Sequence, residues 1–183
     1  IVTGGKSKPN AQELVNGNAT VYNYGTLEAT KSQFTIKGTY LTDGDLNFPG
    51  DKLNIEGSCY VGGNLTAKEL TNSGMRLNVK GNCNLGSSTL KINGSGNAYW
   101  EDPKAGIMNV DGTLTCGNLE ICSSAKLYSS CAVKVANEVN INSSSTFSVS
   151  YLKADKIIQS SGTIFKLKNQ SLIECDTYID NNA

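Results

Sequence analysis

Apolar and polar residues alternate in short runs that return along the chain. The clearest run is LNIEG, followed by close copies and one looser copy: LNIEG at 53–57, LNVKG at 77–81, MNVDG at 108–112 and FTIKG at 34–38. Successive side chains of a strand point to opposite sides, so Leu53 and Ile55 are expected on a buried face. A glycine then ends each run where the chain can turn. The pattern predicts short β-strands, each with one buried face.

Three columns of residues recur every 19 positions in the first half of the chain. They are Gly25, Gly44 and Gly63; Leu27, Leu46 and Leu65; and Val15, Phe34 and Leu53. A supersecondary unit repeated at a fixed period is typical of a solenoid. We therefore expect an all-β fold, a right-handed single-stranded parallel β-helix (β-solenoid) of about seven to eight coils. Its interior is expected to be lined by Leu53, Ile55, Leu77, Val79, Met108 and Val110.

The chain of 183 residues is expected to form a single β-helix domain, 1–183. Residues 1–17 are polar and rich in turn residues, which predicts a lead-in or cap. Residues 93–106 exceed the regular coil and are expected to form an inserted loop. Because an uncovered end coil presents unpaired strand edges, end-to-end self-association is a further expectation.

The expected inserted loop contains the candidate binding residues. They are Tyr99, Trp100, Glu101 and Asp102, in the segment NGSGNAYWEDPKAG. Solenoids often carry their binding surfaces on such insertions. Aromatic rings stack on sugar faces and carboxylates accept hydrogen bonds from hydroxyl groups, so a glycan is the ligand that this set suggests. The alternative is that Tyr99 and Trp100 fold back as a lid over one side of the helix.

Composition and charge narrow the function classes. Sixteen basic and sixteen acidic side chains give a formal net charge of zero, and no basic stripe is present to neutralise a run of phosphates, so nucleic acid is not an expected partner. No apolar run approaches the length of a membrane-spanning helix. The sequence carries no cofactor motif, no histidine and no C-x-x-C pair, so neither a cofactor nor a structural zinc is expected. Because the chain starts at Ile1, we expect that an upstream segment precedes it in the full gene product.

Two of the six cysteines occupy matching places in the repeat. Cys59 and Cys83 each follow the start of a similar run by six residues, Leu53 in one case and Leu77 in the other. They are therefore expected to stack in adjacent coils, about 4.8 Å apart, a spacing that a disulfide tolerates. We expect both to face inward as small buried residues and to be reduced.

Catalysis is the main alternative, because polysaccharide lyases and hydrolases also use right-handed β-helices. Those reactions need paired carboxylates, or an acidic cluster that binds calcium together with a strong base. The candidates are Asp43 with Asp45, Glu101 with Asp102, and Asp111. They are scattered among the repeats and lack a histidine partner, so we expect no enzyme. A polysaccharide-degrading lyase or hydrolase remains the alternative function.

Several segments of the chain resemble a known family. They are GGNLTAKELTNSG, SSTLKINGSG, YLKADKIIQSSGTIF and SLIECDTYIDNNA. Together they resemble the repeat region of LruC-domain cell-surface proteins of Bacteroidetes, and more loosely the bactofilin β-helix, over residues 18–183. The resemblance implies an exported, surface-attached bacterial protein with no catalytic residues to carry over. The sequence thus predicts a non-catalytic extracellular or cell-surface module, either a rigid spacer or a platform that binds a glycan or a surface protein.

Overall fold

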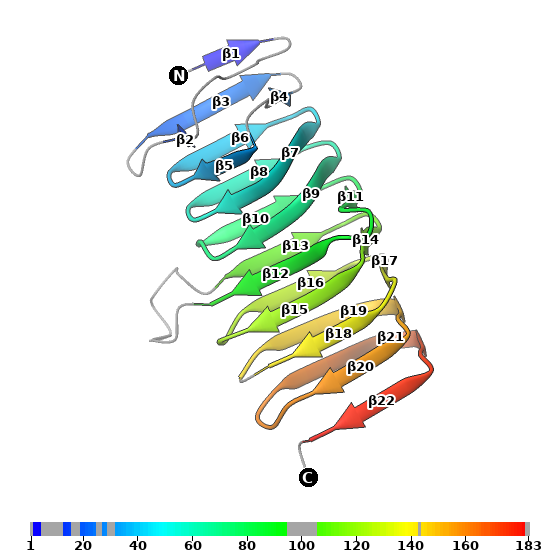
Figure 1. The fold of residues 1–183 in the computed structure, drawn as a ribbon. Helices are drawn as coiled ribbons and strands as arrows, with labels where there is room; N and C mark the ends of the chain where they lie inside the picture. The colour runs from blue at the N-terminus through cyan, green and yellow to red at the C-terminus, as the bar shows by residue number, and fades with distance from the viewer. Residues whose placement is uncertain are drawn as a thin grey trace.

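The protein is an all-β solenoid. Its structure, a computed structural model, describes residues 2–4, 13–15, 19–24, 27–28, 32–94, 106–142 and 144–181. In these residues the chain forms 22 strands and no helix, and the strands stack in about seven turns (Figure 1). All pairings between the described strands are parallel, for example β10 with β13 and β15 with β18. The expected parallel β-helix is confirmed.

The strands lie on three faces, which we call A, B and C. Face A consists of β1 (Val2–Gly4), β3 (Thr20–Tyr24), β6 (Thr39–Thr42), β8 (Ser58–Val61), β10 (Arg76–Val79), β13 (Ile107–Val110), β16 (Lys126–Ser129) and the first parts of β19 (Thr146–Lys153) and β21 (Ile164–Glu174). Face B consists of β4 (Leu27–Glu28), the first parts of β7 (Leu46–Ile55) and β9 (Leu65–Asn72), then β11 (Cys83–Asn84), β14 (Leu114–Cys116), β17 (Ala132–Val135) and the second parts of β19 and β21. Face C consists of β2 (Glu13–Val15), β5 (Gln33–Ile36), the second parts of β7 and β9, then β12 (Thr89–Asn93), β15 (Asn118–Cys122), β18 (Glu138–Ile141), β20 (Lys156–Gln159) and β22 (Thr177–Asp180).

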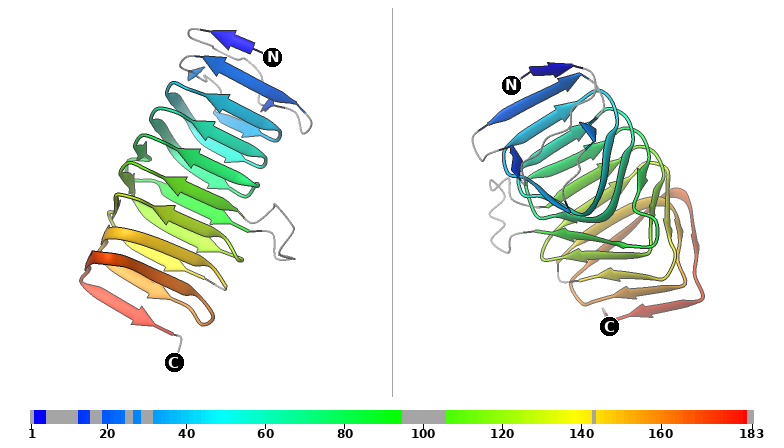
Figure 2. Two further views of the ribbon diagram at one scale, coloured as in Figure 1. Left: turned by 180° about the vertical axis from the view of Figure 1, so that it is seen from behind. Right: turned by 45° about the horizontal axis from the view of Figure 1, so that its top comes forward.

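The winding of the chain is right-handed. In Figure 1 each coil runs from left to right along face A at the back, turns through the short strands of face B at the right edge, and returns along face C at the front. Each circuit steps down from the N-terminus toward the C-terminus, and the same stacking is seen from behind and with the N-terminal end brought forward (Figure 2). This is the hand that parallel strands with crossover connections adopt almost without exception.

The core is a column of inward side chains, one set per coil. All six residues expected in the interior, Leu53, Ile55, Leu77, Val79, Met108 and Val110, are at most 1% exposed. Alternate residues of the same strands face outward, as the burial pattern of β10 and β13 shows. The two-residue period therefore predicted correctly which side chains fill the core.

The corner between faces A and B is stabilised by a ladder of side-chain to backbone hydrogen bonds. Asp45 Oδ1 accepts a bond from the backbone N–H of Asn64 at 2.6 Å, and Asn64 Oδ1 accepts one from Asn82 at 2.9 Å. Asn82 Oδ1 in turn accepts a bond from the N–H of Thr113 at 2.8 Å. Each bond joins one coil to the next, so the ladder satisfies corner N–H groups that the strands do not pair.

The register differs from the one expected for the repeated runs. The runs LNVKG and MNVDG do stack, because Leu77 pairs with Met108 on face A. The run LNIEG lies on face C, where Leu53 pairs with Leu70. Each coil carries two long strands with the same alternation, and a glycine follows both kinds. Sequence likeness alone therefore does not distinguish a strand on face A from one on face C.

The expected stacking of Cys59 on Cys83 is wrong for the same reason. Cys59 lies on face A opposite Leu77, whereas Cys83 lies on face B opposite Leu65. Both side chains are nevertheless buried, and all six cysteines are free. Burial raises the pKa of both thiols far above the ordinary value, so in the folded protein they behave as small apolar core residues.

Two segments singled out in the sequence join the solenoid at defined points. Within residues 1–17, β1 pairs with β3 and β2 pairs with β5. The expected insertion falls between the end of β12 at Asn93 and the start of β13 at Ile107. Its two flanking glycines are close together, because a Cβ atom on Gly106 would lie 2.2 Å from the carbonyl oxygen of Asn93 and 2.9 Å from the nitrogen of Gly94. The described residues on either side of the segment thus meet at a single corner, between face C and face A.

The last described coil is uncovered. Leu167 pairs with the buried Val149, yet it is 51% exposed because no further coil stacks on it among the described residues. End-to-end self-association through such an end stays a prediction.

Candidate ligand-binding groove on face A

The four candidate binding residues of the insertion, Tyr99, Trp100, Glu101 and Asp102, lie outside the described residues. The structure instead brings together a different set of aromatic and polar side chains on the outer surface of face A, close to the N-terminal end of the solenoid.

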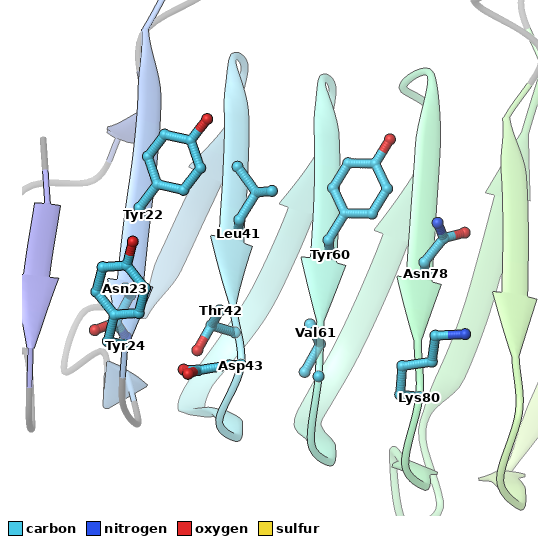
Figure 3. A pocket seen from close by; sticks show the side chains of 11 residues that line it. Tyr22, Asn23, Tyr24, Leu41, Thr42, Asp43, Tyr60, Val61, Asn78 and Lys80 are labelled. Carbon is cyan, nitrogen blue, oxygen red and sulfur yellow. The ribbon is translucent and has the colours of Figure 1, made fainter.

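The first part of this set is a row of outward side chains across four neighbouring strands. Tyr22 of β3 pairs with Leu41 of β6, Leu41 with Tyr60 of β8, and Tyr60 with Asn78 of β10. Figure 3 shows the four side chains in one line on the same side of the sheet. Tyr22 is 44% exposed, and Leu41 and Tyr60 are half-buried. Two phenol rings therefore flank an aliphatic side chain on a flat, hydrogen-bonded surface.

A second row runs beside the first, at the ends of the same strands. It contains Tyr24, Asp43 and Lys80, which Figure 3 labels, and Gly62, which follows Val61 as Asp43 follows its partner Thr42. All four residues are exposed. Between the two rows is an open groove of about 320 Å³, lined by Tyr22, Asn23, Tyr24, Leu41, Thr42, Asp43, Tyr60, Val61, Gly62, Asn78 and Lys80. A Cβ atom on Gly62 would lie 2.7 Å from the carbonyl oxygen of Asp43, so the close approach of the two coils requires glycine there. The missing side chain leaves the groove open between Asp43 and Lys80.

A buried polar pair lies beneath the groove. Asn23 and Tyr40 face inward, 2% and 1% exposed, and Asn23 Nδ2 donates a hydrogen bond to the Tyr40 hydroxyl oxygen at 3.0 Å. Burial raises the pKa of Tyr40 to about 12, so its hydroxyl stays protonated at neutral pH. A satisfied polar pair in a core ties its two strands into one register. In this way the pair holds β3 against β6 and fixes the positions of the outward rings above it.

The same two rows continue toward the C-terminus as a smaller, more polar hollow of about 220 Å³. Here Asn109 Nδ2 donates a hydrogen bond to Asn78 Oδ1 at 2.6 Å, and Lys80 Nζ forms an ion pair with Asp111 Oδ2 at 2.8 Å. Amide groups and an exposed ion pair thus extend the aromatic groove along the solenoid axis.

Three of the carboxylates considered for catalysis, Asp43, Asp45 and Asp111, belong to the described residues and have different surroundings. Asp43 borders the groove, Asp45 belongs to the corner ladder, and Asp111 pairs with Lys80. Asp43 and Asp111 are three coils apart on face A, which corresponds to roughly 14 Å at about 4.8 Å per coil. That separation exceeds the roughly 6.5 to 9.5 Å between the paired carboxylates of an inverting glycosidase.

Sequence reasoning identified only Asp43 among the groove residues and missed its aromatic members. The signal was present, because Tyr22, Leu41 and Tyr60 are spaced by the same 19 residues as the glycine and leucine columns. An outward column that keeps large apolar side chains in three successive coils is unusual for a solvent-facing row, and it could have identified the groove.

Other features of the described residues do not compete with the groove as a site. Within the described ranges no group of three or more histidine, cysteine or acidic residues is placed to hold a metal ion. The same part of the chain has no helix of the length and hydrophobicity needed to cross a bilayer. A further open hollow of about 630 Å³ lies on the face B side, but its apolar lining side chains Phe48 and Leu85 are only 1% and 2% exposed, so it presents no ring to a ligand.

The fold and the groove together define a parallel β-solenoid with an exposed aromatic groove on one flat face. The chain matches no protein-family model, no curated protein and no solved structure.

Proposed function

We propose that this chain is a non-catalytic module of an exported bacterial surface protein, and that it binds a glycan through the groove on face A. The observation that carries the proposal is the row Tyr22, Leu41 and Tyr60, which presents two phenol rings and an aliphatic side chain on the outside of a rigid sheet.

The chemistry of the groove suits a sugar. Pyranose rings have an apolar face of C–H groups, which packs on aromatic rings, and a rim of hydroxyl groups. Tyrosine offers an apolar body with a polar tip, and the groove adds the carboxylate of Asp43 and the amide of Asn78 as hydrogen-bonding partners for hydroxyl groups. A mainly apolar lining with a few polar groups at its border is typical of a ligand-binding site.

The rigidity of the surface favours binding. The strands β6, β8 and β10 are each paired on both sides, and the buried Asn23 and Tyr40 fix the edge of the set. Because the backbone is already ordered, a ligand has to immobilise only the exposed side chains, and the entropic cost of binding is smaller.

The proposal is tested by screening the purified chain on a glycan array and measuring the affinity for each hit by titration calorimetry. Tyr60→Ala removes a ring from the centre of the groove and is expected to weaken binding at least tenfold. The matched control is Tyr128→Ala, because Tyr128 is a half-exposed tyrosine in the same outward row, three coils farther along face A and outside the groove. It is expected to bind as the unmodified chain does.

The outcomes separate the alternatives. Equal loss in both tyrosine variants, or no loss in either, contradicts a site at the groove. Absence of any glycan hit refutes the proposal and leaves a spacer or a protein-binding platform. Release of reducing ends or unsaturated products from a polysaccharide, abolished by Asp43→Asn, would instead establish the polysaccharide-degrading alternative.

The proposed location is a separate claim with its own test. It is supported by the resemblance to LruC-domain surface proteins. In the native bacterium, labelling of intact cells with a reagent that does not cross membranes should modify the protein. Modification only after lysis contradicts a surface location.

A further inference from the structure

The coil repeat sets the distance between the aromatic rings of the groove. Tyr22 and Tyr60 lie in the same outward row with one strand, that of Leu41, between them. Because neighbouring parallel strands are about 4.8 Å apart, the two tyrosines are separated by roughly 9.6 Å along the solenoid axis. This distance is close to the length of two sugar residues in an extended β-1,4-linked chain, in which every second residue presents the same side.

The charges along the row indicate what kind of chain fits. Asp43 and Lys80 border the groove with opposite charges, and Lys80 is already paired with Asp111 at 2.8 Å. Beyond Tyr60 the row continues with the amides of Asn78 and Asn109. No run of like charges lies along the groove to attract a polyanion or a polycation, so the surface matches an uncharged chain rich in hydroxyl groups.

We infer that the groove takes an uncharged, extended β-1,4-linked glycan that lies parallel to the solenoid axis. One sugar ring stacks on Tyr22, the next covers Leu41, and the third stacks on Tyr60. The inference rests on the proposed function and deepens it, because it specifies the linkage, the direction and the shortest chain that makes both ring contacts. A trisaccharide is the first to reach both tyrosines.

Ligand length and linkage test the inference with the unmodified chain. Cello-oligosaccharides from the disaccharide to the hexasaccharide are titrated, and the trisaccharide is expected to bind roughly tenfold more tightly than the disaccharide, as the gain of one ring contact implies. Malto-oligosaccharides of equal length are the control. They contain the same sugar, but their α-linkage curves the chain away from a straight row, so they should gain little with length.

A composition-neutral variant tests the spacing itself. Leu41→Tyr combined with Tyr60→Leu keeps two tyrosines and one leucine in the row but shortens the distance between the rings from two coils to one. All the exchanged side chains stay in outward, half-buried positions of paired strands, so an unchanged thermal midpoint is expected. A disaccharide should then stack on two adjacent tyrosine rings, so the affinity for cellobiose should rise roughly tenfold. The affinity for cellotriose, which still covers two tyrosines and one leucine, should change much less.

The results distinguish this inference from the proposed function. Equal affinity for cello- and malto-oligosaccharides, or an affinity for cellobiose that the double substitution leaves unchanged, overturns the register and the linkage but leaves a glycan site. If the array hits are confined to charged or branched glycans and their binding is lost in Tyr60→Ala, the groove is a glycan site but the inferred β-1,4-linked ligand is wrong. If no glycan binds in any assay, the proposed function itself fails.

Discussion

Faces A and C are built from strands of the same kind, but their outer surfaces differ. On face C, oppositely charged side chains stand opposite each other in adjacent coils: Lys52 with Glu69 at 2.7 Å, Lys91 with Glu120 at 3.0 Å, and Lys156 with Glu138 at 3.0 Å. On the N-terminal half of face A, the outward side chains that stand opposite each other in adjacent coils are Tyr22, Leu41 and Tyr60. Face C satisfies its charges within the solenoid, whereas face A exposes apolar rings to the outside.

The difference shows how a solenoid separates stability from recognition. The ion pairs of face C link one coil to the next across an exposed surface, where each is worth only a fraction of a kcal/mol. The tyrosine rings of face A are partly exposed on the outer surface, and they gain further burial when a ligand covers them. Both faces stand on one shared core, so substitutions in the core, on face C and on face A should affect stability by successively smaller amounts.

The largest effect is expected from the shared core. Ile55→Asp places an unpaired carboxylate at a position that is 0% exposed, which should lower the free energy of unfolding by roughly 3 to 5 kcal/mol. Thermal unfolding by circular dichroism measures the loss. The buried thiol of Cys59 provides a local readout, because it should react with a thiol reagent quickly in the variant and slowly in the native protein. Native-like protection of Cys59 in Ile55→Asp contradicts the assignment of Ile55 to the core.

A smaller effect is expected from breaking the charge pattern of face C. Glu120→Lys sets two positive side chains opposite each other at Lys91 and should destabilise the fold by about 0.5 to 1 kcal/mol at low salt. The hydrogen bond from Lys91 to Glu120, which raises the pKa of the lysine, is lost in the variant. Chemical denaturation in low and high salt provides the measurement, because screening should reduce the difference. Glycan binding should not change, and a change would show that the two faces are coupled.

The pH dependence of one ion pair sharpens the comparison further. The hydrogen bond from Lys156 lowers the pKa of Glu138 below its ordinary value of 4.5. Because the pKa of Glu138 is lower in the folded state than in the unfolded state, the ionised side chain stabilises the fold at pH values above the unfolded-state pKa. This contribution is lost as the pH falls through the folded-state pKa. The pair is partly exposed, so Glu138→Gln should cost only about 0.5 kcal/mol at neutral pH. Denaturation at a series of pH values should show this difference from pH 7 to near 5 and its loss in stronger acid. A difference that grows in acid contradicts the sign.

The smallest effect on stability is expected on face A. Tyr22→Ser removes a ring that lies outside the core and is 44% exposed, so the free energy of unfolding should change by less than about 0.5 kcal/mol. The same variant should bind glycan several-fold more weakly. A large loss of stability would show that Tyr22 has a structural role, and it would remove the contrast between the two faces.

The fold and the core could be predicted from the sequence because they depend on local alternation. A strand with one buried face repeats its pattern every two residues. Leu77 and Val79 fit this pattern, and both are buried in the core. The register could not be predicted in the same way, because the distance between stacked positions varies. It is 17 residues from Leu53 to Leu70 and 31 from Leu77 to Met108. The number of residues in each turn sets the sequence distance between stacked positions, and the alternation of residues within a strand carries no information about it.

The groove was missed because its aromatic members keep the regular period of the repeat, and alternation within a strand does not distinguish a binding row from an ordinary solvent-facing row. The insertion with Trp100 is conspicuous as a departure from the repeat, whereas Tyr22 and Tyr60 keep to it. The sequence signal for the groove is the 19-residue spacing of Tyr22, Leu41 and Tyr60, which places the three side chains in one outward column. In a solenoid, the outward residues of successive coils should be aligned with one another in the same way as the inward residues.

The corner where Asn93 lies against Gly106 is a suitable insertion site for foreign sequence. Its two ends are already in contact, so the coil closes whatever the length of the chain between them, and doubling that length adds only about 0.6 kcal/mol of closure entropy. A peptide epitope, or a small folded domain whose own termini are adjacent, could replace residues 95–105 and leave the strands on either side undisturbed. The position lies where the chain enters face A, so cargo grafted there would be displayed next to that face at one fixed place.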